Sequence, residues 1–540
     1  MKKYSIIVAS VSVLIIAFAS CKKSYLAEKP YSSYTPLTLN DSLGFEAAAV
    51  GLYNYESTIL TYSSAQGWPS VWQVGTDVAN ATANQQGIEV PYYNYAQLTP
   101  TDGAASYIWG KYYALINNAN IIIKAVEDPS NTKLTAKGKN MIDAEAKFFR
   151  AYAYNSLATL FGKVPLVTAP LAAPKTDFVR APLDQVNNLI ISDLTFASAN
   201  LADLNAGTSK LNVQGKPVDR ANKYMAMQLL AEAYLRMGKN DLAEQQAQAV
   251  ISSGKFSLIS SRYGVRASGA GDYYSDMFVY GNQRRSQGNS EAIWVIEQEN
   301  PNSVVGGNTD NAQQRRVWGA AYYNISGMVI CDSLGGRSIA RLRLSNWVLY
   351  GLYPTGDLRN SQYSIRRRYY INNPAAANFG QQVPFTGPDT LYKICPSITK
   401  WGAFDPNDTF GYAMIKDFMM MRLGETYLLL AEAQVKQSKT AEAANTINVL
   451  RTRAQAPQVT ASQMTLDFVL DERARELIGE ENRRMTLMRT GTLVDRATRL
   501  NSNDVQHPTT GLAAKNLLLP IPLSEIQLNK DAVLEQNPGY

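Results

Sequence analysis

The sequence predicts a mainly α-helical fold, in which helix hairpins form a scaffold and a loop-rich region is inserted between them. Apolar residues recur at helical spacing in six segments. These segments are 109–126, 137–161, 183–201, 222–252, 417–454 and 465–490. Residues 254–410, by contrast, are rich in Gly, Asn, Ser, Pro, Tyr and Trp and show weak periodicity. Long irregular stretches inside a compact body usually carry function, so we expect ligand contacts there and in the shorter stretch 62–106.

The first residues predict export and a lipid anchor. Lys2 and Lys3 precede an apolar run that ends near Phe18, a pattern typical of a signal peptide. The run is shorter than the roughly 20 residues that a transmembrane helix needs. The Ala-Ser-Cys sequence that ends at Cys21 resembles a bacterial lipobox. We therefore predict a signal peptide over 1–20 and a lipid on the Cys21 thiol. An ordinary cleavage site followed by an incidental cysteine is the alternative.

The mature chain is expected to be one domain. Residues 21–36 form a polar tether, and residues 37–540 follow as a single unit. Within this unit, alanines at regular spacing on both sides of Gly238 and of Ser438 are typical of tetratricopeptide-like hairpins of about 34 residues. Plain helical bundles are the alternative for each hairpin. The helical scaffold is placed mainly in 109–253 and 411–490.

Composition excludes several classes of protein. The 52 basic and 45 acidic residues are dispersed along the 540 residues, so the net charge of +7 marks no nucleic-acid surface. A single histidine, His507, and the absence of a Cys-x-x-Cys motif argue against a structural zinc site. No Asp-rich calcium loop is visible, so we predict no cofactor and no metal ligands, although a structural Ca²⁺ is left open.

The chain carries no catalytic motif. It has no Gly-x-Ser-x-Gly, no phosphate loop and no His-Glu-x-x-His, so we predict no catalytic residue and no enzyme activity. A glycosidase would need two carboxylates across a cleft. The acids at 472, 476, 480 and 481 instead share one predicted helix with arginines, which favours ion pairs on a helix surface. Cys331 and Cys395 leave a disulfide open in an exported protein.

Five blocks resemble the SusD/RagB family. Residues 143–168, DAEAKFFRAYAYNSLATLFGKVPLVT, are similar to its signature helix and the Val-Pro-Leu turn that follows. Further blocks follow in the family's order at 222–258, 421–454, 472–491 and 518–540. The Gly-Glu-Glu-Asn-Arg-Arg sequence at 479–484 departs from the family's usual Phe-Glu-Gly-His-Arg character. We therefore expect different packing there.

The resemblance implies a nutrient-binding lipoprotein of the outer membrane that faces the cell exterior. Its implied ligand is an oligosaccharide or polysaccharide, and its implied partner is a SusC-like TonB-dependent transporter. It implies a helical fold with tetratricopeptide-like repeats and a ligand surface built from loops. Two alternatives stay open, a peptide or protein-fragment receptor of the same type and a surface polysaccharide hydrolase.

Sugar recognition needs flat aromatic faces flanked by hydrogen-bonding groups, and the chain has 32 Tyr and 7 Trp. The candidates lie in the two segments where the resemblance places sugar platforms. The candidate ligand-binding residues are Tyr92, Tyr93, Trp318, Tyr322 and Tyr323, with Asp77, Asn84, Arg315 and Arg316 as polar neighbours. The alternative for each aromatic residue is burial, because aromatic side chains also pin long loops to the body.

Overall fold

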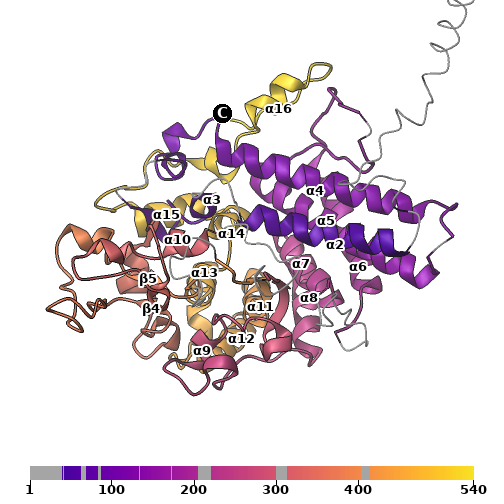
Figure 1. The fold of residues 1–540 in the computed structure, drawn as a ribbon. Helices are drawn as coiled ribbons and strands as arrows, with labels where there is room; N and C mark the ends of the chain where they lie inside the picture. The colour runs from indigo at the N-terminus through magenta and orange to yellow at the C-terminus, as the bar shows by residue number, and fades with distance from the viewer. Residues whose placement is uncertain are drawn as a thin grey trace, which may run out of the picture.

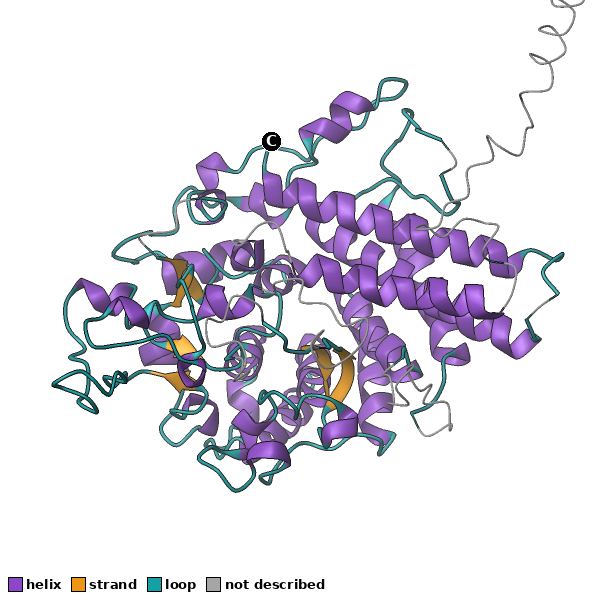
Figure 2. Ribbon diagram, viewed as in Figure 1, coloured by secondary structure: helices purple, strands orange, loops and turns teal. Residues whose placement is uncertain are grey.

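The computed structural model describes residues 39, 42–61, 68–82, 87–132, 134–171, 173–204, 220–299, 313–402 and 414–540. Helices dominate these residues, and the strands are few and short (Figure 2). The mainly α-helical prediction is therefore confirmed. Cys21 and Asn84 lie outside the described residues. None of the described helices combines the length and the apolar character that crossing a membrane requires.

Four helices lie alongside one another at one end of the molecule (Figure 1). They are α2 (Ser42–Thr61), α4 (Gly103–Glu127), α5 (Ala136–Phe161) and α6 (Leu183–Asn200). Helix α5 packs against the other three, and its buried alanines let their backbones come close. Asp102 caps α4 by accepting a hydrogen bond from the Ala105 amide at 2.8 Å. A buried ion pair between Arg150 and Asp193, 2.8 Å between Nε and Oδ2, joins α5 to α6.

Two helix hairpins continue the scaffold. They are α7 (Lys223–Arg236) with α8 (Asn240–Ser252), and α11 (Leu423–Lys436) with α12 (Thr440–Arg453). Helix α8 packs on α11. Both turns place one residue in the left-handed region, Gly238 at φ +73° and Ser438 at φ +61°. Lys239 and Lys439, which follow them, each donate a backbone hydrogen bond of 2.9 Å to the preceding helix. The two predicted hairpins therefore share one turn geometry.

The described strands form three two-stranded antiparallel sheets, and one of them, β2 with β6, joins the irregular region to this scaffold. The pairs are β1 (Ala79–Ala81) with β3 (Leu342–Leu344), β2 (Ala292–Ile296) with β6 (Phe418–Arg422), and β4 (Ile365–Arg366) with β5 (Ser397–Ile398). The prediction of a helix from Asp417 is wrong for its first turn, because residues 418–422 pair with β2. In a short apolar run, the sequence pattern of a helix is hard to distinguish from that of a mostly buried strand.

The remaining helices are short. They are α3 (Trp68–Val71), α9 (Tyr273–Asp276), α10 (Gln314–Trp318), α13 (Leu466–Leu477), α14 (Arg483–Arg489), α15 (Leu493–Asn501) and α16 (Leu523–Leu528). Residues 320–398, here called the loop lobe, surround a small core of their own that includes Tyr322, Tyr369 and Ile371. In Figure 1 the loop lobe lies at the left edge, around β4 and β5.

Candidate functional site

Two cavities adjoin where the scaffold meets the irregular region. Their volumes are about 230 Å³ and about 170 Å³. Trp318, at the end of α10, and Trp401, shortly after β5, line both cavities. The two tryptophan side chains therefore form a shared wall of both cavities.

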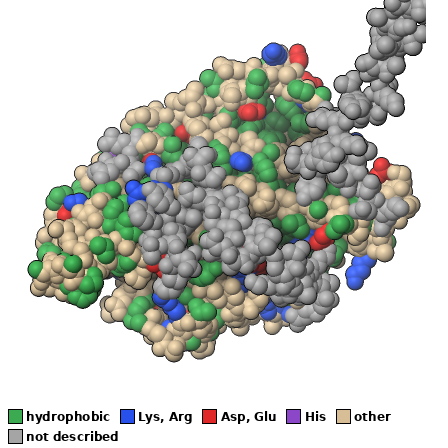
Figure 3. Space-filling model, viewed as in Figure 1, with side chains coloured by type: hydrophobic (Ala, Val, Ile, Leu, Met, Phe, Trp, Pro, Cys, Tyr) green, Lys and Arg blue, Asp and Glu red, His purple; other side chains and the backbone are tan. Residues whose placement is uncertain are grey.

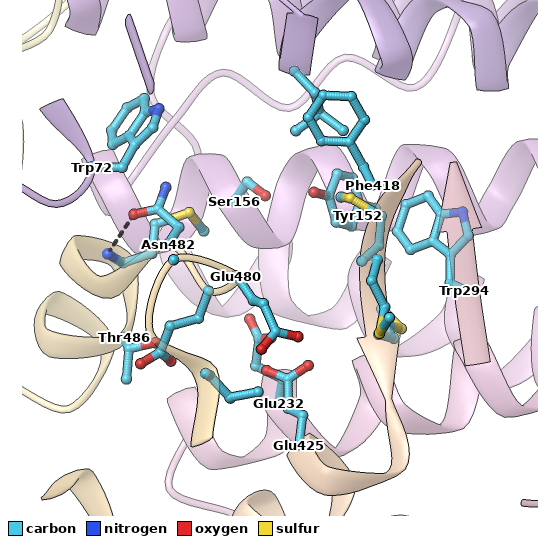
Figure 4. A pocket seen from close by; sticks show the side chains of 18 of the residues that line it. Trp72, Tyr152, Ser156, Glu232, Trp294, Phe418, Glu425, Glu480, Asn482 and Thr486 are labelled. Carbon is cyan, nitrogen blue, oxygen red and sulfur yellow. Dashed lines mark hydrogen bonds between the residues drawn. The ribbon is translucent and has the colours of Figure 1, made fainter. Parts of the chain in front are cut away.

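The larger cavity is walled by aromatic and methionine side chains on several elements. In Figure 4, Trp72 lies on one side and Phe418, Tyr152 and Trp294 on the other, with Glu480 and other carboxylates below them. The aromatic and methionine residues that line it are Trp72, Tyr112, Tyr152, Trp294, Trp318, Trp401, Phe418, Met419, Met420, Met421 and Met485. Flat apolar faces thus stand opposite groups that accept hydrogen bonds.

The acidic side of this cavity is electrostatically compensated. Arg473 pairs with Glu425 at 2.9 Å and with Glu481 at 2.8 Å, and Arg422 pairs with Glu480 at 2.7 Å. Burial alone raises the pKa of Glu480, but Arg422 and Lys400 hold that pKa below its ordinary value. For Glu425 burial prevails and the pKa is raised. The wall therefore offers both hydrogen-bond donors and acceptors, as a polyhydroxylated ligand requires.

Behind this wall lies a buried ionic network that the sequence placed on a helix surface. Glu476 is fully buried and accepts hydrogen bonds from Arg422 at 2.6 Å and Arg359 at 3.0 Å, and it also pairs with Arg453. The surface prediction is wrong, because Glu472 and Glu476 are buried and the arginines that reach Glu476 come from distant segments. Helix α13 also ends at Leu477, so Glu480 lies beyond it.

Trp401 is held in place by buried polar contacts. Its Nε1 donates a hydrogen bond of 2.7 Å to the carbonyl of Gly479. The Nζ of Lys416 donates to the carbonyl of Gly402 at 3.0 Å, and that of Lys400 donates to Glu480 at 2.6 Å. Burial lowers the pKa of Lys416 to about 7 and that of Lys400 to about 8. The segment that carries Trp401 is therefore fixed on both sides of the indole.

The smaller cavity is built from loops. Tyr280 and Tyr363 join the two tryptophans in its wall, and Tyr280 is 38 % exposed. Its polar lining includes Ser275, Ser338, Gln362, Asp332 and Arg366. Every one of these residues lies in the stretch 254–410, where we expect ligand contacts. The lining thus mixes aromatic rings with hydroxyl, amide and charged groups.

Among the predicted ligand-binding residues, two reach a cavity. Trp318 lines both, and Arg315 lines the smaller one. Arg316 lies in the same short helix and is buried. Tyr323 is half-buried, and Tyr93 packs against His507 with ring centroids 4.7 Å apart.

Three other candidates occupy core positions. Tyr92 is fully buried and its hydroxyl donates to Asp102 at 2.6 Å. The Tyr322 hydroxyl donates to backbone carbonyls of the loop lobe. Asp77 accepts hydrogen bonds from Arg483 and Arg496 at 2.6 to 2.8 Å. These three side chains are engaged in core contacts and line neither cavity.

Sequence reasoning missed Trp401, Tyr363 and Tyr280. They are separated by many residues and follow no motif, so only the folded chain brings them together. Within the described residues, no group of three or more His, Cys, Asp and Glu side chains is placed to hold a metal ion. Cys331 and Cys395 are free thiols, not a disulfide.

Two family models match the sequence. One, described as the SusD family, matches residues 343–540, and one, described as starch-binding associating with outer membrane, matches residues 24–235. The chain belongs to the SusD family. Curated relatives in this family include SusD-like protein P25 of Formosa agariphila, 25 % identical over 98 % of both chains. Another is the starch-binding protein SusD of Bacteroides thetaiotaomicron, 23 % identical over 84 % of this chain and 82 % of that protein.

Solved structures share the SusD-family fold. A SusD homolog from Bacteroides thetaiotaomicron superposes with a TM-score of 0.72 at 19 % identity, covering 95 % of this chain and 100 % of that chain. A laminarin binding SusD-like protein superposes with a TM-score of 0.68 at 22 % identity, covering 93 % of this chain and 100 % of that chain. The SusD-like arrangement predicted from the five sequence blocks is therefore confirmed.

Proposed function

We propose that the protein is a glycan-binding lipoprotein on the cell surface, anchored through Cys21 in the outer membrane. It captures an oligosaccharide or polysaccharide, delivers it to a SusC-like TonB-dependent transporter and catalyses no reaction. The observation that carries the proposal is the shared wall that Trp318 and Trp401 form between the two cavities. Relatives described as starch-binding and laminarin-binding support it.

The geometry suits single sugar units. Each cavity is smaller than the roughly 300–1,000 Å³ of pockets that hold drug-sized ligands. The C–H face of a sugar ring stacks on an indole, and its hydroxyls exchange hydrogen bonds with the carboxylates and guanidiniums opposite. Because Trp401 is already fixed by Gly479, little side-chain entropy is lost when a ligand binds.

The first test is affinity gel electrophoresis of the soluble protein beginning after Cys21, run against plant, host and microbial polysaccharides. Trp318→Ala and Trp401→Ala are compared with Tyr350→Ala, a 73 % exposed aromatic outside both cavities. We expect one glycan class to retard the wild type and the Tyr350 variant. Both tryptophan variants should bind at least about tenfold more weakly, a loss of about 1.4 kcal/mol.

Melting temperatures separate lost binding from lost folding, because a variant that binds weakly but melts near the wild type has lost a ligand contact. Peptide binding without glycan retardation would favour the peptide-receptor alternative. Release of sugar products by the purified protein would favour the hydrolase. Co-purification of the full-length protein with a barrel from outer membranes tests the partner, and loss of membrane association in Cys21→Ser tests the anchor.

A further inference from the structure

Exposed aromatic side chains gather on one hairpin of the loop lobe, residues 369–385. Tyr370 is 49 %, Phe379 56 % and Phe385 42 % exposed. Only two further aromatic side chains in the described ranges, Tyr280 and Tyr350, are comparably exposed. Figure 3 shows hydrophobic side chains at the left end of the molecule, over the loop lobe. Exposed apolar groups that cluster in this way mark binding surfaces.

The backbone of the hairpin orients the Tyr370 ring outward. Ile371 donates to the Gln381 carbonyl and Val383 to the Tyr369 carbonyl, both at 2.9 Å. Tyr370 stands opposite Gln382 in this antiparallel pair. Because side chains alternate between the two faces of a strand, Tyr369, Ile371 and Val383 point into the lobe's core. The Tyr370 ring and the Gln382 amide therefore lie next to each other on the outer face.

The hairpin is firmly attached to the lobe beneath it. Tyr369 stacks on Tyr322 with ring centroids 6.1 Å apart, and its hydroxyl lies 3.1 Å from that of Ser397. The Asn372 side chain exchanges two hydrogen bonds, of 2.8 and 2.9 Å, with the backbone of Val329. The outward aromatic rings are consequently carried on an ordered scaffold, so that binding needs little reorganisation.

The hairpin's chemistry selects a neutral ligand. No charged residue occurs from 369 to 388, whereas the stretch contains five side-chain amides. Amides both donate and accept hydrogen bonds, as sugar hydroxyls do. A nucleic acid would require basic residues here. Arginines precede the stretch at 366–368. Arg366 donates to the carbonyls of Leu334 and Ser333, and Arg367 donates to that of Leu349, so both guanidiniums are engaged with the backbone beneath the hairpin.

We propose that the 369–385 hairpin is a second binding surface for a neutral polysaccharide. None of its residues lines either cavity, so it is separate from the site at Trp318 and Trp401. A long glycan that contacts both places at once gains avidity over a short one, which occupies a cavity alone. The hairpin thereby favours polymers over free oligosaccharides.

The test compares long and short glycans on three variants of the soluble protein. Tyr370→Ala/Phe379→Ala removes the hairpin surface, Trp318→Ala alters the cavities, and Tyr350→Ala is the matched control for an exposed aromatic. Amylopectin, laminarin, xyloglucan and galactomannan serve as polymers in affinity gels. The corresponding trisaccharides are titrated by calorimetry.

We expect the hairpin variant to bind the retarding polymer about tenfold or more weakly while its trisaccharide affinity stays at the wild-type value. Trp318→Ala should lower both affinities. Unchanged polymer retention by the hairpin variant overturns the second surface while leaving the cavity site intact. A wild type that none of the four polymers retards overturns both. Unchanged retention combined with weaker co-purification of an outer-membrane barrel would instead assign the hairpin to a protein contact.

Discussion

The indole Nε1 of Trp401 donates a hydrogen bond of 2.7 Å to the carbonyl oxygen of Gly479. This contact joins a wall of both cavities to the turn that follows α13. Gly479 adopts a φ of +79°, and a Cβ atom there would overlap the Ile398 side chain. The same turn carries Glu480 and Glu481, which line the larger cavity. Only glycine satisfies both the backbone geometry and the close approach.

Gly479→Ala is therefore expected to weaken glycan binding as well as stability. The added methyl displaces Ile398 and, with it, Trp401. Gly491→Ala is the matched control, since Gly491 has a φ of +70° but nothing within 4 Å of its Cβ position. Both variants should lose about 1 kcal/mol of stability from backbone strain, and Gly479→Ala should lose more. Affinity gels measure the loss of binding, and urea unfolding measures the loss of stability. Equal binding and equal stability of the two variants would contradict this explanation.

Asp77→Asn should destabilise the protein strongly. The buried Asp77 carboxylate accepts hydrogen bonds from Arg483 and Arg496. Burial alone raises its pKa, yet the two guanidiniums hold the pKa below its ordinary value. Neutralising one partner of a buried ion pair costs about 3–5 kcal/mol, measurable by urea unfolding. A variant of wild-type stability with reduced ligand binding would restore Asp77 as a ligand contact.

Asp77 illustrates which contacts could not be predicted from the sequence. Helical periodicity located the main helices because each one depends on residues three and four positions apart. The partners of Asp77 lie more than 400 residues away, and no local pattern specifies such a pairing. The same holds for Trp401 and Tyr363, whose neighbourhood in the cavities arises only when the loop lobe packs on the scaffold.

Acid should unfold the protein partly through Glu432. Burial raises the pKa of this carboxyl, but a two-point contact with Arg489, 2.7 Å at each oxygen, and Lys436 lower it to about 2 from 4.5. A lowered folded-state pKa stabilises the protein fully above pH 4.5, and this stabilisation disappears as the pH falls towards 2. Its size is roughly 3 kcal/mol.

Glu432→Gln should therefore be less stable at pH 7 and lose less additional stability between pH 5 and 2. Urea unfolding midpoints measured across that range give the slope of stability against pH. Glu535→Gln, a variant of an exposed acid, should keep the wild-type slope. Parallel slopes for all three proteins would contradict the role of Glu432.

The shared hairpin turn predicts opposite effects at its two left-handed positions. Ser438 adopts a φ of +61° that disfavours a side chain. Ser438→Gly should stabilise the protein by up to about 1 kcal/mol. Gly238→Ala, where nothing lies within 4 Å of the added methyl, should destabilise it by a similar amount. Thermal melting of the two variants checks both signs, and equal signs would exclude backbone strain as the cause.

The two free thiols should react at different rates. Cys395 is 1 % exposed, and burial raises the pKa of its thiol to about 12, whereas Cys331 is half-buried. Since the thiolate is the reactive form, a thiol reagent should label Cys331 first and Cys395 only after unfolding. The soluble protein beginning after Cys21 is suited to this assay. Absence of labelling even in denaturant without reductant would indicate a disulfide.

The pairing of Asp77 with Arg483 also sets the order of events in biogenesis. Arg483 lies 406 residues after Asp77, so a chain that emerges from its N-terminus first presents Asp77 well before its partner. During that time the segment around Asp77 has no partner and must stay in water or with a chaperone. The final compaction of this protein therefore waits for its last hundred residues, and C-terminal truncations should be degraded and not merely weakened.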